Sequence, residues 1–285
     1  MEPIVSYKYN TAYPSIGKCI IINNKNFLQK TGMPSRKGTE KDGENLKKTF
    51  EDLGYNVKVF NDQTCNQIES CLLAGNYHSK EASFVCALLS HGDEGVLYGT
   101  DGCITMKKLT NCFGADYCAT LVGKPKMFFI QACRGSGLDA GIEADSAEDE
   151  THYNDFPKEP DFLFAYSTVP GYYSWRNTSM GSWFVQSLCC VLGKYGKELE
   201  LMKILTRVNY KVALGFESCS NTPALNAKKQ IPSSLLCTFK LKSQRILLFF
   251  RSNRCAGIRL PEYSLHKQHC IYWIICKTNR PPAFH

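Results

Sequence analysis

Two residues of this chain place a reactive side chain where open α/β sheets carry their sites. Cys133 ends the apolar run MFFIQAC, and His91 ends the apolar run FVCALLSH. A thiol beside an imidazole is the pair that nucleophilic catalysis by cysteine requires. Each residue also has a plainer interpretation, because a strand-end cysteine is mostly a buried core residue and a lone histidine is mostly a hydrogen-bonded polar one. The residue pair therefore leaves two alternatives for Cys133, a core thiol or a nucleophile.

Four short apolar runs predict the strands that would position this pair. Each is bounded by polar or turn residues, as expected for strands covered on both faces in a parallel sheet. They are KCIIINN (18–24), FVCALLSH (84–91), MFFIQAC (127–133) and FLFAYST (162–168). The carboxyl ends of parallel strands meet at one edge of the sheet, so Cys133 and His91 can meet if their strands are neighbours.

Amphipathic segments accompany these strands. In TEKDGENLKKTFEDLG (39–54), apolar residues recur at helical spacing, Thr39 can cap the start and Gly54 suits the end. Two longer helical segments follow, SWFVQSLCCVLGKYG (182–196) and LELMKILTRVNYKVALGF (199–216). Strands that alternate with helices predict an α/β fold with a doubly wound sheet.

The composition, 44% hydrophobic and 21% charged, is that of an ordinary globular protein. We expect most of the fifteen cysteines to be reduced thiols, because neither an export signal nor a membrane-spanning apolar run is evident. We therefore expect a cytoplasmic protein with no membrane partner, and leave the nucleus open as a second compartment.

The net charge of +8 comes from the end of the chain. Residues 233–285 hold nine of the 34 basic residues and one of the 26 acidic ones, so residues 1–232 are neutral, with 25 of each. A basic patch on the body, and with it nucleic-acid binding, is not favoured. His266, His269, Cys270 and Cys276 match no common zinc spacing, so we expect neither a metal nor a cofactor.

Two other histidines of the body lie in polar, loop-like stretches. His78 and His152 are interpreted as solvated surface residues, which leaves His91 as the candidate base. Residues 139–161 are acidic, poor in apolar residues and contain two prolines. They predict an exposed linker.

The stretch QACRG (131–135) is a cysteine-protease signature, and at this point the sequence resembles the caspase family, in its effector type. The likeness runs from about Tyr7 to Pro232. It includes CIIINNKNF (19–27), SFVCALLSHGDEG (83–95), KPKMFFIQACRG (124–135), AYSTVPGYYSWRN (165–177) and KILTRVNYKVA (203–213). The resemblance implies a three-layer fold with a mostly parallel, six-stranded sheet flanked by helices.

The resemblance also implies roles for the pair. Cys133 would attack a peptide carbonyl and His91 would supply a proton to the departing amine. An imidazolium near the thiol would favour the thiolate, and the amides of Gly92 and Cys133 would hold the oxyanion. Glycine at this position lets the backbone approach the substrate closely.

By the same resemblance, three side chains grip an aspartate just before the cut: Arg36, Gln131 and Arg176. A planar guanidinium binds a carboxylate through two parallel hydrogen bonds. Contacts along the substrate groove are expected from Tyr173, Ser174, Trp175, Asn177 and Trp183. Where effector members have paired phenylalanines, this chain has Cys219 and Asn221, so we expect a weaker preference for aspartate at the fourth residue before the cut.

The acidic linker resembles the family's activation site. Cleavage between Asp145 and Ser146 would separate a large subunit (1–145) from a small one (146–232), and the acidic triplet 148–150 would restrain the uncut zymogen. The expected partners are protein substrates, upstream initiator caspases and a second copy, in a dimer of large–small units. Only 17 residues precede Lys18, so we expect no clear propeptide and no recruitment domain.

The last expectation concerns residues 233–285, which we interpret as an atypical basic tail, either a disordered extension or a gene-model artefact. The alternative is that LLCTFKL (235–241) replaces the family's final strand. The expected function is an aspartate-directed cysteine endopeptidase of programmed cell death. If the final strand is missing, the rival is a catalytically impaired binding or decoy protein.

Overall fold

The computed structural model describes residues 9–10, 12–74, 80–139, 160–237 and 271–272. Several residues discussed above lie outside these ranges. They are His78, Asp145, Ser146, the triplet 148–150, His152, His266, His269, Cys270 and Cys276.

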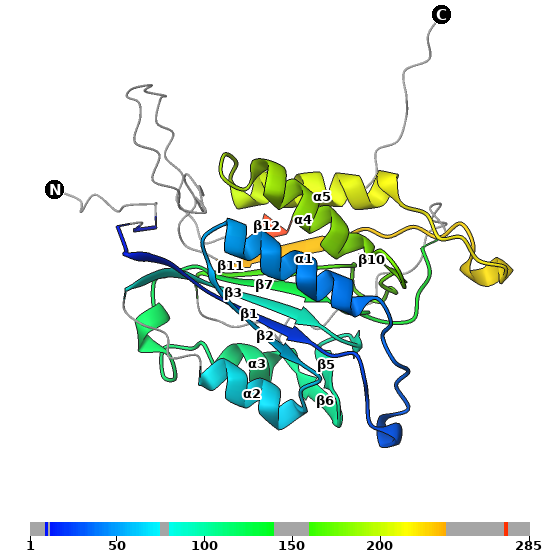
Figure 1. Cartoon of the computed structure of the whole chain (residues 1–285), viewed down its shortest axis with the longest axis horizontal. Helices are drawn as coiled ribbons and strands as arrows, with labels where there is room; N and C mark the ends of the chain where they lie inside the picture. The colour runs from blue at the N-terminus through cyan, green and yellow to red at the C-terminus, as the bar shows by residue number, and fades with distance from the viewer. Residues whose placement is uncertain (1–8, 11, 75–79, 140–159, 238–270, 273–285) are drawn as a thin grey trace, which may run out of the picture.

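A central sheet organises the molecule (Figure 1), with strands in the order β12-β11-β8-β7-β3-β1-β2. The strands are β1 (Ser15–Asn23), β2 (Asn56–Asn61), β3 (Glu81–Leu89), β7 (Lys126–Gln131), β8 (Phe162–Tyr166), β11 (Ser233–Cys237) and β12 (Ile271–Tyr272). The first five are parallel, whereas β11 runs antiparallel to β8 and β12 antiparallel to β11. The predicted six-stranded, mostly parallel sheet is confirmed, and the two-residue β12 extends it.

Helices cover both faces of this sheet (Figure 1). On one face lie α1 (Thr39–Asp52), α4 (Trp183–Tyr195) and α5 (Leu201–Gly215), and on the other α2 (Cys65–Leu73) and α3 (Met106–Asn111). Every residue of β3 is buried, and its alternate side chains enter two separate cores, as the strand period of two requires. The three-layer α/β fold is therefore confirmed. Among the described residues, no helix is both long and apolar enough to cross a bilayer.

Two smaller elements leave the sheet at its carboxyl edge. A three-stranded antiparallel sheet follows His91 and consists of β4 (Gly92–Asp93), β5 (Val96–Gly99) and β6 (Gly102–Thr105). A hairpin of β9 (Arg176–Asn177) and β10 (Gly181–Ser182) precedes α4. Short 3₁₀ turns occupy Gln29–Thr31, Ala119–Leu121 and Pro223–Leu225.

The start of α1 differs from its prediction, whereas its end agrees. The cap residue is Gly38, with a φ of 89°, and not Thr39. The Thr39 hydroxyl instead donates to Asn23 Oδ1 (2.6 Å) and accepts from Arg36 Nη1 (3.0 Å). The tertiary partners of Thr39 thus displace its capping role. Gly54 follows the last turn with a φ of 89°, where glycine is favoured.

The expectation that ordered structure ends at Pro232 is wrong for the next five residues. Residues 233–237 form β11 and pair along the whole of β8, with Leu235 opposite Phe164. Leu235 is only 7% exposed and packs in the core beneath α2 and α3. The strand that the rival interpretation required to be missing is therefore present. Residues 238–270 and 273–285 lie outside the described ranges.

If β11 is part of the core, shortening Leu235 will destabilise the fold. Leu235→Ala is expected to lower the free energy of unfolding by about 2–3 kcal/mol, because it removes buried methyl groups and leaves a cavity. The matched control is Leu214, which lies on α5 and is 66% exposed. Leu214→Ala should change the free energy of unfolding by less than about 0.5 kcal/mol. Urea unfolding of both variants measures the difference. Equal effects would show that β11 contributes nothing to the core.

Candidate active site

Sheet register brings the two predicted catalytic residues to one edge. β3 and β7 are parallel neighbours, with Leu89 opposite Gln131. The Ser90 amide donates to the Gln131 carbonyl (3.2 Å), so the loops that carry His91 and Cys133 leave the sheet side by side. The condition under which the two residues could meet, that their strands are neighbours, is therefore fulfilled.

Gly92 allows these two loops to pack closely. A Cβ atom at this position would lie 2.8 Å from the Ala132 Cβ and 3.0 Å from the Cys133 carbonyl oxygen. Any larger residue would push the histidine and cysteine loops apart. The backbone of Gly92 therefore lies directly against the backbone of the proposed nucleophile.

A second loop holds the cysteine loop from the other side. Gly171 N donates to Arg134 O (2.6 Å), Gly137 N to Gly171 O (2.9 Å), and Tyr173 N to Gly137 O (2.8 Å). Gly135 has a φ of 137°, and a Cβ there would collide with the Gly171 carbonyl. Cys133 is therefore fixed by backbone contacts on both sides rather than by its own side chain.

His91 is oriented by groups that the sequence did not point to. Its Nε2 lies 2.8 Å from the Pro34 carbonyl oxygen, and because a carbonyl only accepts, Nε2 carries the proton. The Phe27 ring packs against the imidazole with centroids 4.9 Å apart. In the neutral ring Nδ1 is therefore left unprotonated and able to accept a proton. Burial, and then Arg36 and Arg176, lower the pKa of His91 against the opposing effect of the Pro34 contact.

Cys133 is half-buried, and burial raises the pKa of its thiol. The Ser174 amide, whose nitrogen lies 3.5 Å from Sγ, opposes this rise together with Arg36 and Arg176. A raised thiol pKa beside a lowered imidazole pKa favours the neutral pair near pH 7. The expected thiolate–imidazolium pair is therefore not what the unliganded site favours, because burial and two nearby arginines penalise the imidazolium.

The neutral pair has a testable consequence for thiol reactivity. Alkylation of Cys133 by iodoacetamide should rise about tenfold per pH unit between about pH 6 and about pH 8, because only the thiolate reacts. Peptide mapping by mass spectrometry follows Cys133 against the exposed Cys219 in the same sample. A rate for Cys133 that stays flat over this range would indicate a thiolate–imidazolium pair instead.

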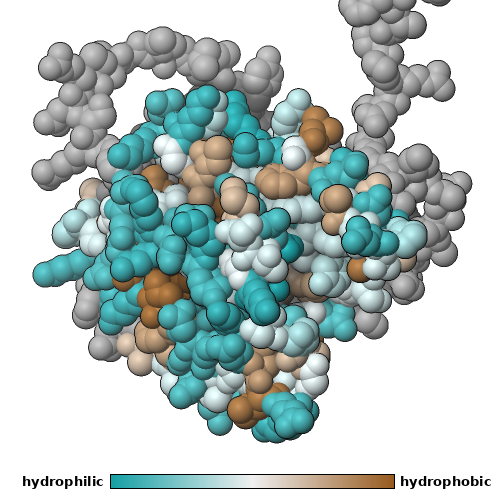
Figure 2. Space-filling view, turned by 45° about the vertical axis from the view of Figure 1, so that its right-hand side comes forward, coloured by the Kyte–Doolittle hydropathy of each residue, from teal (hydrophilic) through white to brown (hydrophobic). Residues whose placement is uncertain are grey.

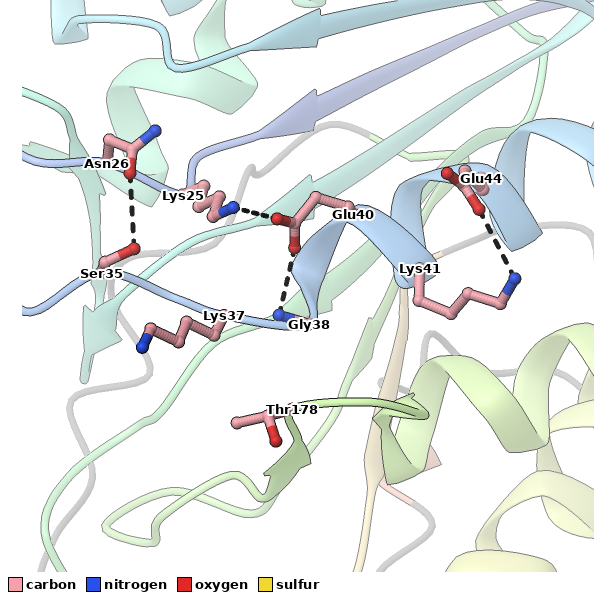
Figure 3. A pocket seen from close by; sticks show the side chains of 9 residues that line it. All are labelled: Lys25, Asn26, Ser35, Lys37, Gly38, Glu40, Lys41, Glu44 and Thr178. Atoms are coloured by element: carbon pink, nitrogen blue, oxygen red, sulfur yellow. Dashed lines mark hydrogen bonds and ion pairs between the residues drawn. The ribbon is translucent and has the colours of Figure 1, made fainter.

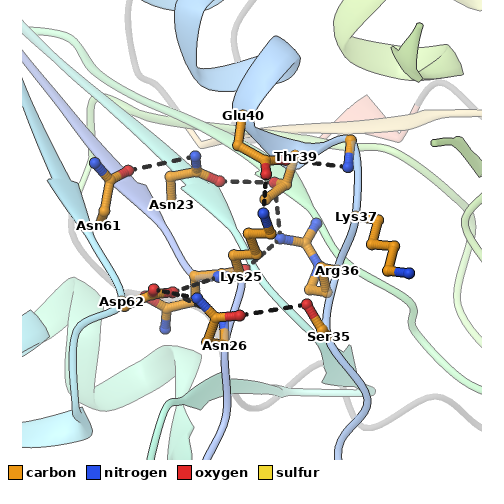
Figure 4. A network of polar contacts seen from close by, with 12 residues as sticks. Asn23, Lys25, Asn26, Ser35, Arg36, Lys37, Thr39, Glu40, Asn61 and Asp62 are labelled. Carbon is orange, nitrogen blue, oxygen red and sulfur yellow. Dashed lines mark hydrogen bonds and ion pairs between the residues drawn. The ribbon is translucent and has the colours of Figure 1, made fainter. Parts of the chain in front are cut away.

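Arg36 is 1% exposed and is the largest fully buried side chain among the residues that the structure describes. Its Nη1 donates to Asn24 O (2.7 Å) and to Thr39 Oγ1 (3.0 Å), within a polar network at the end of β1 and the start of α1 (Figure 4). Its Nε and Nη2 find no hydrogen-bond partner among the described residues. Burial first, and then Arg176, lower the pKa of Arg36 to about 9. A buried guanidinium with two unused donors is a preformed receptor for a carboxylate.

The other two predicted clamp residues lie in the same region. Arg176 donates Nε to the Lys37 carbonyl (3.0 Å), which ties β9 to the chain next to Arg36. Burial, the largest cause, lowers the pKa of Arg176. Gln131 donates to Ser174 Oγ (2.8 Å), and its Oε1 is buried without a partner among the described residues. Arg36, Arg176 and Gln131 thus converge near Cys133, as the resemblance implied.

A row of aromatic rings continues from this region into the core. Tyr173 meets Trp175 edge to face, Trp175 stacks on Trp183, and Trp183 stacks on Phe216, at centroid separations of 5.2, 5.7 and 5.4 Å. Tyr173 is 43% exposed, whereas Trp183 is only 7% exposed. Trp183 is therefore mostly buried rather than exposed in a groove, and its ring supports the ring of Trp175 from the core side.

Of the remaining predicted groove residues, Asn177 lies at the surface, whereas Ser174 is buried, 5% exposed. Asn177 Oδ1 accepts from Ser179 N (2.9 Å), Ser179 Oγ (2.7 Å) and Met180 N (2.9 Å), so its oxygen closes the β9–β10 turn. Cys219 and Asn221, which stand where effector members have phenylalanines, are both exposed. Phe216, the residue that follows α5, stacks on Trp183.

A hollow of about 590 Å³ lies next to the clamp, between the start of α1 and the β9–β10 turn (Figure 3). Its lining includes Lys25, Lys37 and Lys41. Lys25 pairs with Glu40, and Lys41 pairs with Glu44 (3.5 Å). The surrounding face is mainly hydrophilic, with apolar residues in small separate groups (Figure 2). The outer wall of the clamp is therefore a charged, open surface.

Some site residues carried no sequence signal. Pro34 and Phe27 orient His91, and Gln230 accepts from the Trp175 amide (2.7 Å) while donating to the Ser167 carbonyl (2.7 Å). A main-chain carbonyl has no residue-type signature, and one glutamine in a polar loop resembles any other. Among the described residues, no group of three or more His, Cys, Asp or Glu could hold a metal ion. The predicted cleavage site at Asp145 and Ser146 lies outside the described ranges.

Known proteins match this chain over most of its length. The family model described as "Caspase domain" matches residues 16–241. The chain is 58% identical over 236 residues to caspase-7 of Gallus gallus, covering 80% of this chain and 76% of that protein. It is 58% identical over 227 residues to caspase-3 of Felis catus and 57% identical over 227 residues to caspase-3 of Mus musculus, covering 79% of this chain and 82% of each relative.

Fold, site and relatives together define a cysteine-type endopeptidase. The chain belongs to the caspase family. The resemblance to the effector type is confirmed by these identities, which are equally high to caspase-7 and caspase-3. The family match continues to residue 241, so the expected end of the likeness at Pro232 is wrong, in agreement with the position of β11.

Proposed function

We propose that this protein cleaves protein substrates after aspartate residues during programmed cell death, as an effector-type protease. The observation that carries the proposal is the buried Arg36, whose Nε and Nη2 have no partner among the described residues. A neutral substrate side chain would leave those charged donors unpaired, at a cost of several kcal/mol. An aspartate carboxylate would satisfy them, with Arg176 and Gln131 beside it.

The chemistry follows from the protonation states of the pair. His91 Nδ1 takes the proton of the Cys133 thiol as sulfur attacks the scissile carbonyl carbon, and the amides of Gly92 and Cys133 receive the oxyanion. Collapse of the tetrahedral intermediate breaks the C–N bond, and the imidazolium returns the proton to the leaving amine. Water, deprotonated by His91, then hydrolyses the thioester and restores the thiol. The lowered pKa of His91 suits a group that accepts and returns a proton within one cycle.

A short-peptide assay tests the class and the clamp together. After cleavage or autoprocessing, the full-length protein should release an amine leaving group attached to the last residue of a short peptide, an aspartate. It should cut the asparagine analogue at least about 10³-fold more slowly, because asparagine leaves Arg36 and Arg176 without a charged partner. Cys133→Ala should abolish both activities, since it removes the nucleophile. Equal rates on the two peptides would contradict the aspartate clamp. Activity that survives in Cys133→Ala would contradict the nucleophile.

We also propose that the chain is made as a zymogen. The sequence IEADS (142–146) supports cleavage between Asp145 and Ser146, by upstream initiator caspases, into the large (1–145) and small (146–232) subunit regions with the tail attached. The product would assemble as a dimer of large–small units. The preserved β11 supports this proposal, because it leaves the family's final strand in place.

Replacing the predicted cleavage residue tests activation. Asp145→Ala should leave the chain as one band on a denaturing gel when an initiator caspase is added, whereas the wild type should divide into two. Its activity on the aspartate-ended peptide should then be lower by at least about tenfold, because the linker stays intact. Asp139→Ala, in the same acidic region but outside the motif, is the control and should mature normally. Normal maturation of Asp145→Ala would refute this site.

For the location we propose the cytoplasm, with the nucleus as a second compartment. Twelve described cysteines are free thiols, which supports a reducing environment. The decoy alternative loses its basis, since the strand that it required to be absent pairs fully with β8.

A further inference from the structure

One buried carboxylate near the clamp has no part in the chemistry described so far. Asp42 lies in α1 with a fully buried side chain, 0% exposed. Its Oδ1 accepts a hydrogen bond from the Ser182 amide (2.8 Å), across 140 residues of sequence. Its Oδ2 is buried without a hydrogen-bond partner among the described residues. Burying a charge with so few hydrogen bonds destabilises the fold, and we therefore expect a functional role of Asp42.

The amide that Asp42 holds has a special place in the clamp. Ser182 pairs directly with Arg176 in the β9–β10 hairpin. Ser182 is also the N-cap residue of α4, and Trp183 is the first residue of that helix. A shift of Ser182 would therefore move both a guanidinium of the clamp and the base of the aromatic row.

Close packing leaves the hairpin little freedom around this contact. Gly181 has a φ of 90°, and a Cβ there would collide with Asp42 Oδ1. A Cβ at Gly38 would lie 2.6 Å from the Asn177 carbonyl oxygen. Both strands of the hairpin thus lie against the start of α1, the element that begins three residues after Arg36.

Electrostatics link the same carboxylate to both arginines. Asp42 raises the pKa of Arg36 and of Arg176, each of which is lowered mainly by burial. Burial in turn raises the pKa of Asp42 to about 6 against the hydrogen bond from Ser182. The carboxylate therefore offsets part of the repulsion between the buried guanidinium of Arg36 and the half-buried guanidinium of Arg176 while no substrate is bound.

We propose that Asp42 is a positioning residue for aspartate recognition. Through the Ser182 amide it fixes Arg176 relative to Arg36, so that both guanidinium groups face one carboxylate. This inference rests on the proposed function, because it assumes that the two arginines form the aspartate pocket. It assigns Asp42 to substrate recognition and leaves the thiol chemistry of Cys133 unaffected.

Substitutions at Asp42 distinguish a role in positioning the clamp from a role in the stability of the fold. Asp42→Ala removes the acceptor of the Ser182 amide and should raise KM for the aspartate-ended peptide about tenfold, the scale of one charged hydrogen bond, with kcat changed less than about twofold. Its preference for aspartate over asparagine should fall by a similar factor. Asp42→Asn keeps an oxygen acceptor of the same shape and should restore KM to within about threefold of wild type. Alkylation of Cys133 by iodoacetamide should be unchanged in both.

Glu81 provides the matched control. It is a buried carboxylate, 5% exposed, at the start of β3 and thus at the opposite edge of the sheet, where it pairs with Lys18 (3.7 Å). Glu81→Ala should reduce the yield of folded enzyme without changing KM or the preference for aspartate. If Asp42→Ala does not fold, Asp42→Ser takes its place, because a hydroxyl there falls short of the Ser182 amide.

Two outcomes are distinguished by a parallel measurement on Arg36→Gln. If Arg36→Gln loses the preference for aspartate while the Asp42→Ala or Asp42→Ser enzyme keeps the wild-type KM and preference, the positioning role of Asp42 is overturned and the clamp stands. If Arg36→Gln retains the preference for aspartate, the clamp itself is wrong and the proposed function fails first. A rise in KM in Asp42→Ala, reversed by Asp42→Asn, supports the inference.

Discussion

The site depends on two guanidinium groups near a thiol, that of Arg36 buried and that of Arg176 half-buried. Arg36 is held by one carbonyl and one hydroxyl, and its remaining donors are unused in the free protein. Burial lowers the pKa of both arginines, Arg176 further lowers that of Arg36, and both arginines lower that of His91. The unliganded pocket is thus held in an unfavourable, positively charged state, which only an anion relieves. The same positive charge favours a carboxylate ligand and helps to keep His91 neutral, whereas burial keeps the Cys133 thiol protonated against the effect of the two arginines.

The surrounding fold is built to maintain that state. Backbone contacts pin the cysteine loop between the His91 loop and residues 171–173. Arg134, next to the nucleophile, pairs with Glu94 (2.5 Å), lies over the Tyr166 ring, and donates to Ser233 Oγ (3.4 Å). The last of these contacts connects the active-site loop to β11. β11 therefore also supports the active-site loop.

The residues differed in how well they could be predicted. Apolar runs located β1, β3, β7 and β8, because a strand covered on both faces must be continuously apolar. Thr39 was predicted to cap α1 by local rules, but Asn23 and Arg36 compete for its hydroxyl. β11 was predicted only as an alternative, within LLCTFKL (235–241), because the strand is short, begins with two serines and is followed by basic residues. Asp42 had no signal of its own, since acidic residues are common in the first turns of helices.

By itself, the sequence determined the α/β class and the positions of four main strands along the chain. Through QACRG (131–135) and SFVCALLSHGDEG (83–95) it also indicated the family and the candidate reactive residues. These features depend on short patterns of neighbouring residues, which can be identified from the sequence directly. Only the tertiary structure decided the proton on His91 Nε2, the neutral thiol, the free donors of Arg36 and the link from Asp42 to Ser182. Each of these is set by burial and by contacts between residues far apart in the chain. Neither burial nor long-range contacts can be inferred from a short segment of sequence.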